Sequence, residues 1–322
     1  MNSIEQIAEK FKSKKIGLFF EEELSARSSF KIGGKAALLI EPGDEEALAF
    51  ALTEIRNAKI PYFVLGGGTN VLFDDSGFDG IVVSTKKLSG ISLAQDDGAK
   101  NGGKAIIRAA AGESVAALVS FAQEKGLTGL EEFAGLPGTV GGAVYMNARC
   151  FDREMSEVAA KITWLEWTDN AQAQDGAGAF RVKSAVFAPS DWAYKKSPFT
   201  GTGRVVLSAE FIVQKGDKAS IAQKAAAFIQ ERKDKGHYKF PCAGSVFKNN
   251  RAFGRPTGKI IDELGLKGER RGGAQIAPFH GNIIINAGGA SSADVRALVD
   301  LCKARAKEKF GIELEEEIIF AG

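Results

Sequence analysis

The chain has 322 residues, of which 44% are hydrophobic and 25% are charged, and 42 Lys and Arg stand against 40 Asp and Glu. The resulting formal net charge of +2 provides no global field that would favour nucleic acid or an anionic membrane, so anions must be bound at local sites. A chain of this length usually needs more than one hydrophobic core, which predicts two or three domains.

The N-terminal segment, residues 1–15, places Ile4, Ile7 and Phe11 on one face of a predicted helix. It lacks the continuous apolar core of a signal peptide, and no later segment reaches the roughly 18 uninterrupted apolar residues of a membrane span. The three cysteines are far apart and lack CxxC spacing, which argues against a disulfide framework or a zinc site. We therefore expect a cytoplasmic protein without a metal site and without a membrane or nucleic-acid partner.

The first predicted domain, residues 1–88, alternates strands and helices. A strand over Ala36–Ile40 precedes a helix that Asp44 opens. The strand Tyr62–Leu65 follows and runs into the glycine loop Gly66–Gly68. This order predicts a βαβ unit, in which ligands tend to bind at the carboxyl end of a strand, where the loop lies.

The second predicted domain, residues 89–214, contains a second glycine loop. Its expected elements are a strand, a helix, the loop and two paired strands: Ala105–Ala111, Ser114–Glu124, Gly135–Gly142, Ile162–Trp167 and Val205–Val213. The polar stretch Gln95–Gly103 predicts an exposed hairpin or connector, and Ala171–Ala179 predicts a solvated turn. The third predicted domain, residues 215–322, is more helical, because apolar residues recur at helical spacing over Asp217–Lys235 and Ala293–Lys309.

The two glycine loops are candidates for binding a phosphate group, because bare backbone amides can approach an anion closely. A triple glycine by itself usually marks only a turn. Gly66–Gly68 does not fit the dinucleotide fingerprint GxGxxG, since Thr69–Phe73 is too rich in β-branched and aromatic residues to start a helix, and the Walker pattern is absent. Pro137 stiffens the second loop, as expected of a preformed binding surface. Two such loops suit a long diphosphate such as that of FAD.

Six segments, in this order, resemble the UDP-N-acetylenolpyruvoylglucosamine reductase family: Ser29–Gly34, Leu65–Asn70, Gly135–Ala148, Ala243–Asn249, Leu266–Gln275 and Leu314–Ile318. The resemblance spans nearly the whole chain. It implies an α+β fold of the vanillyl-alcohol-oxidase-like (PCMH-type) FAD-binding class, made of two subdomains and a smaller C-terminal α+β substrate domain. The connection over Val213–Asp217 is short, so the chain resembles the subtype that lacks an extra tyrosine-bearing loop.

The same resemblance implies the cofactor and the reaction. FAD would be bound noncovalently and NADPH would reduce it, after which a UDP-N-acetylglucosamine enolpyruvyl ether would be reduced to UDP-N-acetylmuramate for peptidoglycan synthesis. We expect a monomer whose partners are these small molecules. The implied cofactor contacts are Gly66, Gly67, Gly68, Thr69, Asn70, Gly135, Pro137, Gly138, Thr139, Gly141, Gly142, Ala143 and Asn147.

Three residues match catalytic positions of the family. Ser245 corresponds to its proton donor, and Glu317 to a glutamate at the carboxyl end of the substrate that takes part in the proton-donor network. The segment around Leu314–Ile318 is expected to be a strand, along which Glu317 shares a face with Glu315 and Ile319, and this permits an inward Glu317. The family arginine is replaced by Lys195, which keeps the charge but loses the bidentate fork, and Lys196 or Arg181 could compensate.

The resemblance also implies substrate contacts, at Tyr194, Arg232, Lys235, Asn249 and Gln275. Arg232 and Lys235 resemble a basic pair that meets a pyrophosphate, although cations at the end of a helix are also favoured by its dipole. Gly236–His237 stands where the family commonly has Gln-Pro, which implies a more flexible linker. Neither His237 nor His280 has the spacing of a catalytic triad or a metal site.

Two alternatives stay open from the residues themselves. One is another FAD-dependent oxidoreductase of the same fold, acting on a sugar or an alcohol, with Cys150 as the nearest candidate for tethering the flavin. The other is a flavin or UDP-sugar binding module without turnover, suggested by Lys195 in place of arginine.

Overall fold

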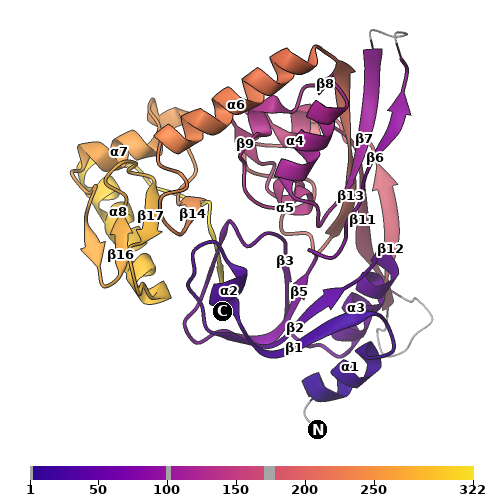
Figure 1. The fold of residues 1–322 in the computed structure, drawn as a ribbon. Helices are drawn as coiled ribbons and strands as arrows, with labels where there is room; N and C mark the ends of the chain where they lie inside the picture. Colours follow the sequence, from indigo (N-terminus) through magenta and orange to yellow (C-terminus); the bar gives the residue numbers. More distant parts are fainter. Residues whose placement is uncertain (1–2, 99–102, 170–177) are drawn as a thin grey trace. The chain divides into compact units, whose positions relative to one another are not determined.

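The structure is a computed structural model that describes residues 3–98, 103–169 and 178–322 (Figure 1). Most of the predicted turn Ala171–Ala179 and part of the predicted connector Gln95–Gly103 therefore lie outside the described residues. From the N-terminus to residue 98 the helices and strands are α1 (Ser3–Phe11), β1 (Ile16–Glu23), α2 (Leu24–Arg27), β2 (Lys35–Pro42), α3 (Glu45–Asn57), β3 (Tyr62–Leu65), β4 (Val71–Phe73), β5 (Phe78–Ser84) and β6 (Ile91–Asp96).

The central part of the chain contains β7 (Lys104–Ala110), α4 (Val115–Glu124), β8 (Leu127–Thr128), α5 (Val140–Tyr145), β9 (Arg149–Cys150), β10 (Arg153–Glu154), β11 (Ala159–Asp169), β12 (Gly178–Ala185), β13 (Val205–Lys215) and α6 (Lys218–Asp234). The C-terminal part contains β14 (Cys242–Ser245), α7 (Thr257–Glu263), β15 (Arg270–Arg271), β16 (Ala274–Ile276), β17 (Ile283–Asn286), α8 (Ser292–Phe310) and β18 (Ile319–Ala321).

The chain divides into two compact units, and each is formed by separate stretches of sequence. The first unit comprises residues 1–20, 38–67 and 80–230, and the second comprises residues 21–37, 68–79 and 231–322. Short N-terminal stretches thus pack with the C-terminal part of the chain, which no local pattern indicates. The three-domain division at residues 88 and 214 stays a prediction.

The first unit contains a six-stranded sheet in the order β12-β11-β13-β7-β6, with β8 also paired to β13. The predicted pairing of the strands around Ile162 and Val205 is confirmed, since Ile162 lies opposite Ala209 in an antiparallel ladder. Helix α5 packs on β13 and β7, and Figure 1 shows α4 and α5 on the same face of this sheet. The inward-facing side chains of the sheet and these helices form one buried core.

Local capping explains where the predicted helices begin. Asp44 accepts a hydrogen bond from the Ala47 amide (2.8 Å) at the start of α3, and Ser114 accepts one from the Ala117 amide (3.0 Å) at the start of α4. Strand β3 has the predicted bounds and pairs in parallel with β5, which separates it from β2 in the sheet order β1-β2-β5-β3. The predicted strand, helix and strand are therefore all present as β2, α3 and β3, but β2 and β3 are not neighbours in the sheet.

The second unit packs α7 and α8 with the sheet β14-β17-β16-β15. Its core includes Phe30 and Leu72 from the N-terminal stretches and Leu298 from α8. Strand β18 pairs in parallel with β4, so that Ile319 lies opposite Val71. The pairing of β4 agrees with the prediction that Thr69–Phe73 does not start a helix.

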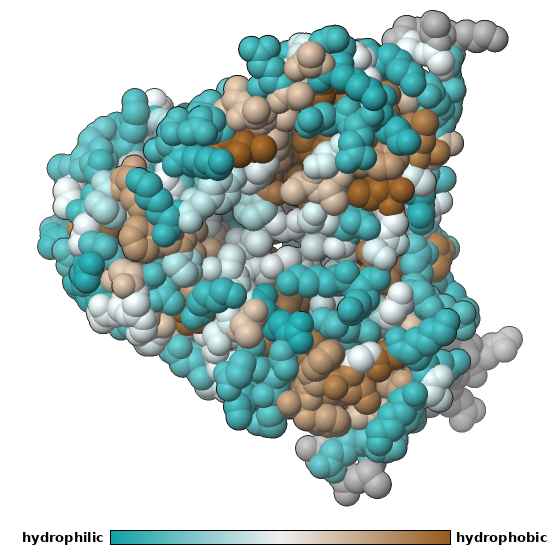
Figure 2. All heavy atoms as spheres, viewed as in Figure 1, coloured by the Kyte–Doolittle hydropathy of each residue, from teal (hydrophilic) through white to brown (hydrophobic). Residues whose placement is uncertain are grey.

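The visible face of the molecule in Figure 2 is mostly hydrophilic, and its hydrophobic residues form separate patches. Within the described residues, no helix is both long and apolar enough to cross a membrane.

Candidate functional site

The two glycine loops touch each other in the first unit. Gly66 and Gly67 follow the end of β3, and the second loop leads into α5. A Cβ atom on Gly67 would lie 2.6 Å from the Gly138 Cα, and one on Gly66 would lie 2.6 Å from the Thr139 Oγ1. Both distances are shorter than real Cβ contacts. The partner of Gly67 is a backbone atom, so the two backbones can approach this closely only with glycine at position 67, whereas the partner of Gly66 is the Thr139 side chain.

The contact leaves backbone donors without protein partners. Within the described part of the chain, the N–H groups of Gly66, Gly67, Gly138 and Thr139 donate to no protein acceptor. Gly66, Gly67 and Gly138 are half-buried. Thr139 is buried, and a buried donor normally has a partner. A cluster of such donors on two touching loops fits an anion with several oxygens.

The remaining residues of the second loop hold its shape. The amides of Val140 and Gly141 donate to Glu113 O (2.8 Å) and Ala111 O (2.9 Å). A Cβ on Gly141 would lie 2.8 Å from the Ala111 Cβ, so packing requires this glycine. The Gly141 amide is therefore used inside the protein, and the predicted contact of Gly141 with the cofactor stays a prediction.

The other predicted cofactor residues of this loop are described by their backbone conformation, their exposure and their hydrogen bonds. Gly135 and Gly138 have φ of 74° and 108°, values that favour glycine, and Pro137 is exposed. Thr139 caps α5 by accepting from the Gly142 amide (3.4 Å), while Ala143 is buried and its amide donates to Thr139 O within the helix.

Asn147 is predicted to contact the cofactor, but its side chain is fully buried. Its Nδ2 donates to Glu154 Oε2 (2.9 Å) and Ala193 O (3.0 Å), and its Oδ1 accepts from the Ser156 amide (3.0 Å). Every hydrogen-bonding atom of the carboxamide is thus used within the first unit. Asn147 holds the turn that begins at Ala193, and its contact with the cofactor stays a prediction.

That turn carries Tyr194 and Lys195. Ala193 and Lys196 exchange two backbone hydrogen bonds of 2.9 Å, which closes a tight turn with Lys195 at φ 57°. A left-handed conformation is uncommon for lysine and has to be held by its surroundings. Lys195 is half-buried, with its Nζ 5.9 Å from the centroid of the Tyr194 ring, whereas Lys196 and Arg181 are exposed.

Ser245 lies in the second unit, at the end of β14. This strand pairs with β17, and the register shifts between Cys242, opposite Ile285, and Ser245, opposite Ile283. Gly244 has φ 75° and open space around a hypothetical Cβ, so its conformation rather than crowding favours glycine there.

Glu317 is held beside the Ser245 segment. Its amide donates to Val246 O (2.7 Å), and its carbonyl accepts from Asn70 Nδ2 (2.9 Å). The predicted strand over residues 314–318 is wrong: only Glu316 forms an isolated bridge, and the chain bends at Ile318 before β18 begins. The alternation argument for the direction of Glu317 therefore does not apply.

The neighbouring acids form ion pairs, as expected of solvated residues. Glu316 pairs with Lys303 (2.8 Å), and Glu315 pairs with Lys248.

The predicted cofactor residue Gly68 also lies in the second unit. It has φ 69°, and a Cβ there would lie 2.2 Å from Arg27 O. Thr69 is half-buried beside it.

The predicted substrate residues of the second unit already have protein contacts. Asn249 Oδ1 accepts from the Thr257 amide (2.8 Å) at the start of α7, and Gln275 bonds Gly268 O (3.0 Å) and Arg270 (3.2 Å). Arg232 Nε donates to the Tyr238 hydroxyl (3.1 Å), and Lys235 pairs with Glu231 (2.5 Å) one turn back on the helix. The structure keeps both cations at the end of α6.

The sequence does not indicate that the two histidines are neighbours. The ring centroids of His237 and His280 lie 5.9 Å apart. Burial, followed by nearby Arg232, His280 and Lys235, lowers the pKa of His237 to about 4. Burial also lowers the pKa of His280. Among the described residues no group of three or more metal-ligating side chains occurs, and two neutral imidazoles do not make a metal site.

Comparison with known proteins identifies the family. The family model of the UDP-N-acetylenolpyruvoylglucosamine reductase C-terminal domain matches residues 234–321, and that of an FAD binding domain matches residues 36–171. A reductase of this name from Treponema denticola is 43% identical over 94% of this chain and 93% of its own length. The chain belongs to the UDP-N-acetylenolpyruvoylglucosamine reductase family.

Other members of the family agree along the whole chain. The Bacillus subtilis UDP-N-acetylenolpyruvoylglucosamine reductase is 34% identical over 99% of both chains. The crystal structure of the Thermus caldophilus reductase superimposes with a TM-score of 0.69 and 30% identity, covering 95% of this chain and 99% of that one. The predicted α+β FAD-binding fold is confirmed. The connection from β13 to α6, Lys215 to Lys218, is as short as predicted.

The flavin-tethering alternative finds no support in this reductase-family chain, because Cys150 is only 5% exposed within the short strand β9.

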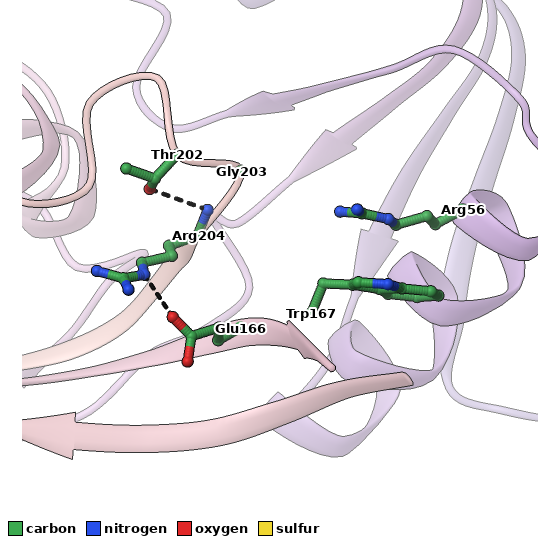
Figure 3. A pocket seen from close by; sticks show the side chains of 6 residues that line it. All are labelled: Arg56, Glu166, Trp167, Thr202, Gly203 and Arg204. Atoms are coloured by element: carbon green, nitrogen blue, oxygen red, sulfur yellow. Dashed lines mark hydrogen bonds and ion pairs between the residues drawn. The ribbon is translucent and has the colours of Figure 1, made fainter. Parts of the chain in front are cut away.

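A surface pocket of about 340 Å³ in the first unit is lined by Arg56, Glu166, Trp167, Thr202, Gly203 and Arg204, none of which is a predicted site residue (Figure 3). There Arg204 Nε bonds Glu166 (2.6 Å), and the guanidinium of Arg56 stacks 4.4 Å over Trp167.

Proposed function

We propose that this protein reduces UDP-N-acetylglucosamine enolpyruvate to UDP-N-acetylmuramate, with noncovalently bound FAD and with NADPH as the reductant, in peptidoglycan precursor synthesis. The observation that carries the proposal is the pair of touching glycine loops in a chain that matches reductases over nearly its whole length. The proposal includes that the enzyme acts in the cytoplasm, as a monomer, on small molecules. The net charge of +2 supports only one part of this, that nucleic acid and anionic membranes are not its partners.

The glycine loops fit FAD on their own chemistry. Side chains at Gly66 and Gly67 would fill the space where the loops meet, and the amides of Gly66, Gly67, Gly138 and Thr139 have no protein acceptor among the described residues. These four amides would hold the diphosphate. Once reduced by NADPH, bound FAD would supply the hydride that adds to the terminal carbon of the enolpyruvyl group.

The protein then has to neutralise charge and deliver a proton. Hydride addition breaks the carbon–carbon double bond and leaves an electron pair on the carbon next to the carboxylate, and this carbon must take a proton. We assign the proton to the Ser245 hydroxyl, with Glu317 in the donor network. A hydroxyl is a weak acid, but an enolate carbon is basic enough to accept from it. The cation of Lys195 would stabilise the carboxylate as charge accumulates.

We assign binding of the UDP-sugar to two cations, a tyrosine and two carboxamides. Arg232 lies in the last turn of α6 and Lys235 comes directly after the helix, and both are assigned to the pyrophosphate. Tyr194, Asn249 and Gln275 are assigned to the rest of the substrate. For Asn249 and Gln275 the supporting observation is that internal hydrogen bonds already orient both carboxamides.

Two half-reactions test the function. Under anaerobic conditions NADPH should bleach the flavin, and the enolpyruvyl UDP-sugar should restore its absorbance with formation of UDP-N-acetylmuramate. Ser245→Ala should leave bleaching unchanged and slow reoxidation by about 10²- to 10⁴-fold, the usual worth of general acid catalysis. Wild-type enzyme that is bleached but not reoxidised by this sugar would refute the substrate, and equal slowing of both steps in the variant would refute the role of Ser245.

A further inference from the structure

The strand that ends at Ser245 contains a β-bulge. Cys242 lies opposite Ile285 and Ser245 lies opposite Ile283, so three steps along β14 correspond to two along β17. The extra residue falls at Ala243–Gly244, where Gly244 has φ 75°. Paired residues share a face, and Ile283 and Ile285 are two apart, so the bulge puts Ser245 on the face of Cys242. Regular pairing would put it on the other face.

Beyond the bulge, Asn282 takes over as the partner of the chain. Its Oδ1 accepts from the Phe247 amide (2.9 Å), and its Nδ2 donates to Phe247 O (2.7 Å). Its own carbonyl accepts from the Val246 amide (2.9 Å). A carboxamide offers the same donor and acceptor as a peptide group, so the side chain continues the ladder where β14 ends.

Asn282 is itself held in place. It is only 2% exposed, and its amide donates to His280 Nδ1 (3.2 Å). The opposite edge of the same segment is held by the Glu317 amide, which donates to Val246 O (2.7 Å). The two residues that follow Ser245 are thus bonded on both edges, which fixes the backbone from which the Ser245 side chain extends.

We propose that Asn282 is a positioning residue for the Ser245 hydroxyl and acts only in the protonation half of the reaction. This inference rests on the proposed function. Without the carboxamide, Phe247 loses both of its partners on this edge. The backbone bonds of Val246 to Asn282 O and to the Glu317 amide remain, so the expected change is a small shift of the segment after the bulge. A displacement of about 1 Å at a reacting group can slow a reaction by about 100-fold.

The test compares Asn282, which directly precedes β17, with Asn286, the last residue of that strand. Asn282→Ala should slow reoxidation by the enolpyruvyl UDP-sugar by about 10- to 100-fold and leave bleaching by NADPH within about twofold. Asn286→Ala is the matched control, because the Asn286 carboxamide bonds Phe30 O, Gly288 N and Ala290 N and does not contact residues 245–247. This control should reoxidise at the wild-type rate.

A double-mutant cycle separates positioning from general damage. If Asn282 acts through Ser245, adding Asn282→Ala to Ser245→Ala should slow reoxidation no further. Should Asn282→Ala fail to fold, Asn282→Asp provides the second variant, since a protonated carboxyl can both accept from the Phe247 amide and donate to Phe247 O. Its reoxidation rate, relative to wild type, should recover as the pH is lowered.

Three results would overturn the inference: wild-type reoxidation in a folded Asn282→Ala, an additive loss in the double variant, or an Asn282→Asp enzyme whose relative rate does not respond to pH. Failure of the proposed function has a different signature, because wild-type enzyme would then not be reoxidised by the sugar at all.

Discussion

The contact between the glycine loops predicts the effect of one added methyl group. In Gly67→Ala the new Cβ would lie 2.6 Å from the Gly138 Cα, and ordinary contact begins near 3.4 Å, so the loops must separate by about 0.8 Å. The atoms nearest to the new Cβ are backbone atoms of Gly138 and Thr139, so no side chain can rotate away to make room. Overpacking of this kind costs about 1–3 kcal/mol, which lowers the melting temperature of the apoprotein by about 2–12 °C.

The same displacement weakens cofactor binding. An amide that donates at about 2.9 Å to a diphosphate oxygen would move beyond hydrogen-bond distance after a shift of about 0.8 Å. Losing one such bond to a charged group costs about 1.5–3 kcal/mol, so the Kd of FAD should rise by about 10- to 100-fold. Titration of apoprotein with FAD, followed by flavin fluorescence, measures this directly.

Gly17→Ala is the matched control for Gly67→Ala. Its Cβ would meet the Phe19 ring at 3.2 Å, and that ring is 36% exposed and can turn aside. The control should bind FAD and melt like the wild type. An unchanged Kd and melting temperature in Gly67→Ala would refute the reasoning, because the two loops would then not be in contact.

Two further predictions concern charge. The pKa of His237 is about 4 in the folded chain and about 6.5 in the unfolded chain, so its contribution to stability is complete above pH 6.5 and is lost as the pH falls toward 4. Urea unfolding at pH 7.5 and at pH 5 should therefore show that His237→Gln loses less free energy of unfolding between these two pH values than the wild type does. Equal losses of free energy in the two proteins would contradict the lowered pKa of His237. Lys195→Ala should slow reoxidation by at least about tenfold, whereas Lys195→Arg should keep or raise the wild-type rate in the same assay, because arginine restores the bidentate fork; a wild-type rate in Lys195→Ala would remove this cation from the mechanism.

Local sequence signals predicted most elements of the fold. Asp44 and Ser114 cap helices where expected, and Tyr62–Leu65 is a strand with the predicted bounds. The edge strand β6 pairs antiparallel with β7, which agrees with the hairpin alternative for Gln95–Gly103. The exposed edge strand β12 was not predicted, because its first residues belong to a polar stretch that resembles a turn. The strand expected over residues 314–318 does not form, since this segment bonds the chain near Val246 and bends before it enters a ladder.

The sequence by itself determined the family, the glycine-rich character of the loops and the residue types at the catalytic positions, because motifs and helix caps depend on near neighbours. Tertiary structure alone decided that Gly67 meets Gly138, that Asn147 supports a turn and that Asn282 holds the segment after Ser245. These contacts join residues tens of positions apart, and the register of β14 depends on a bulge. Neither can be read from local pattern, since both arise only when distant segments pack together.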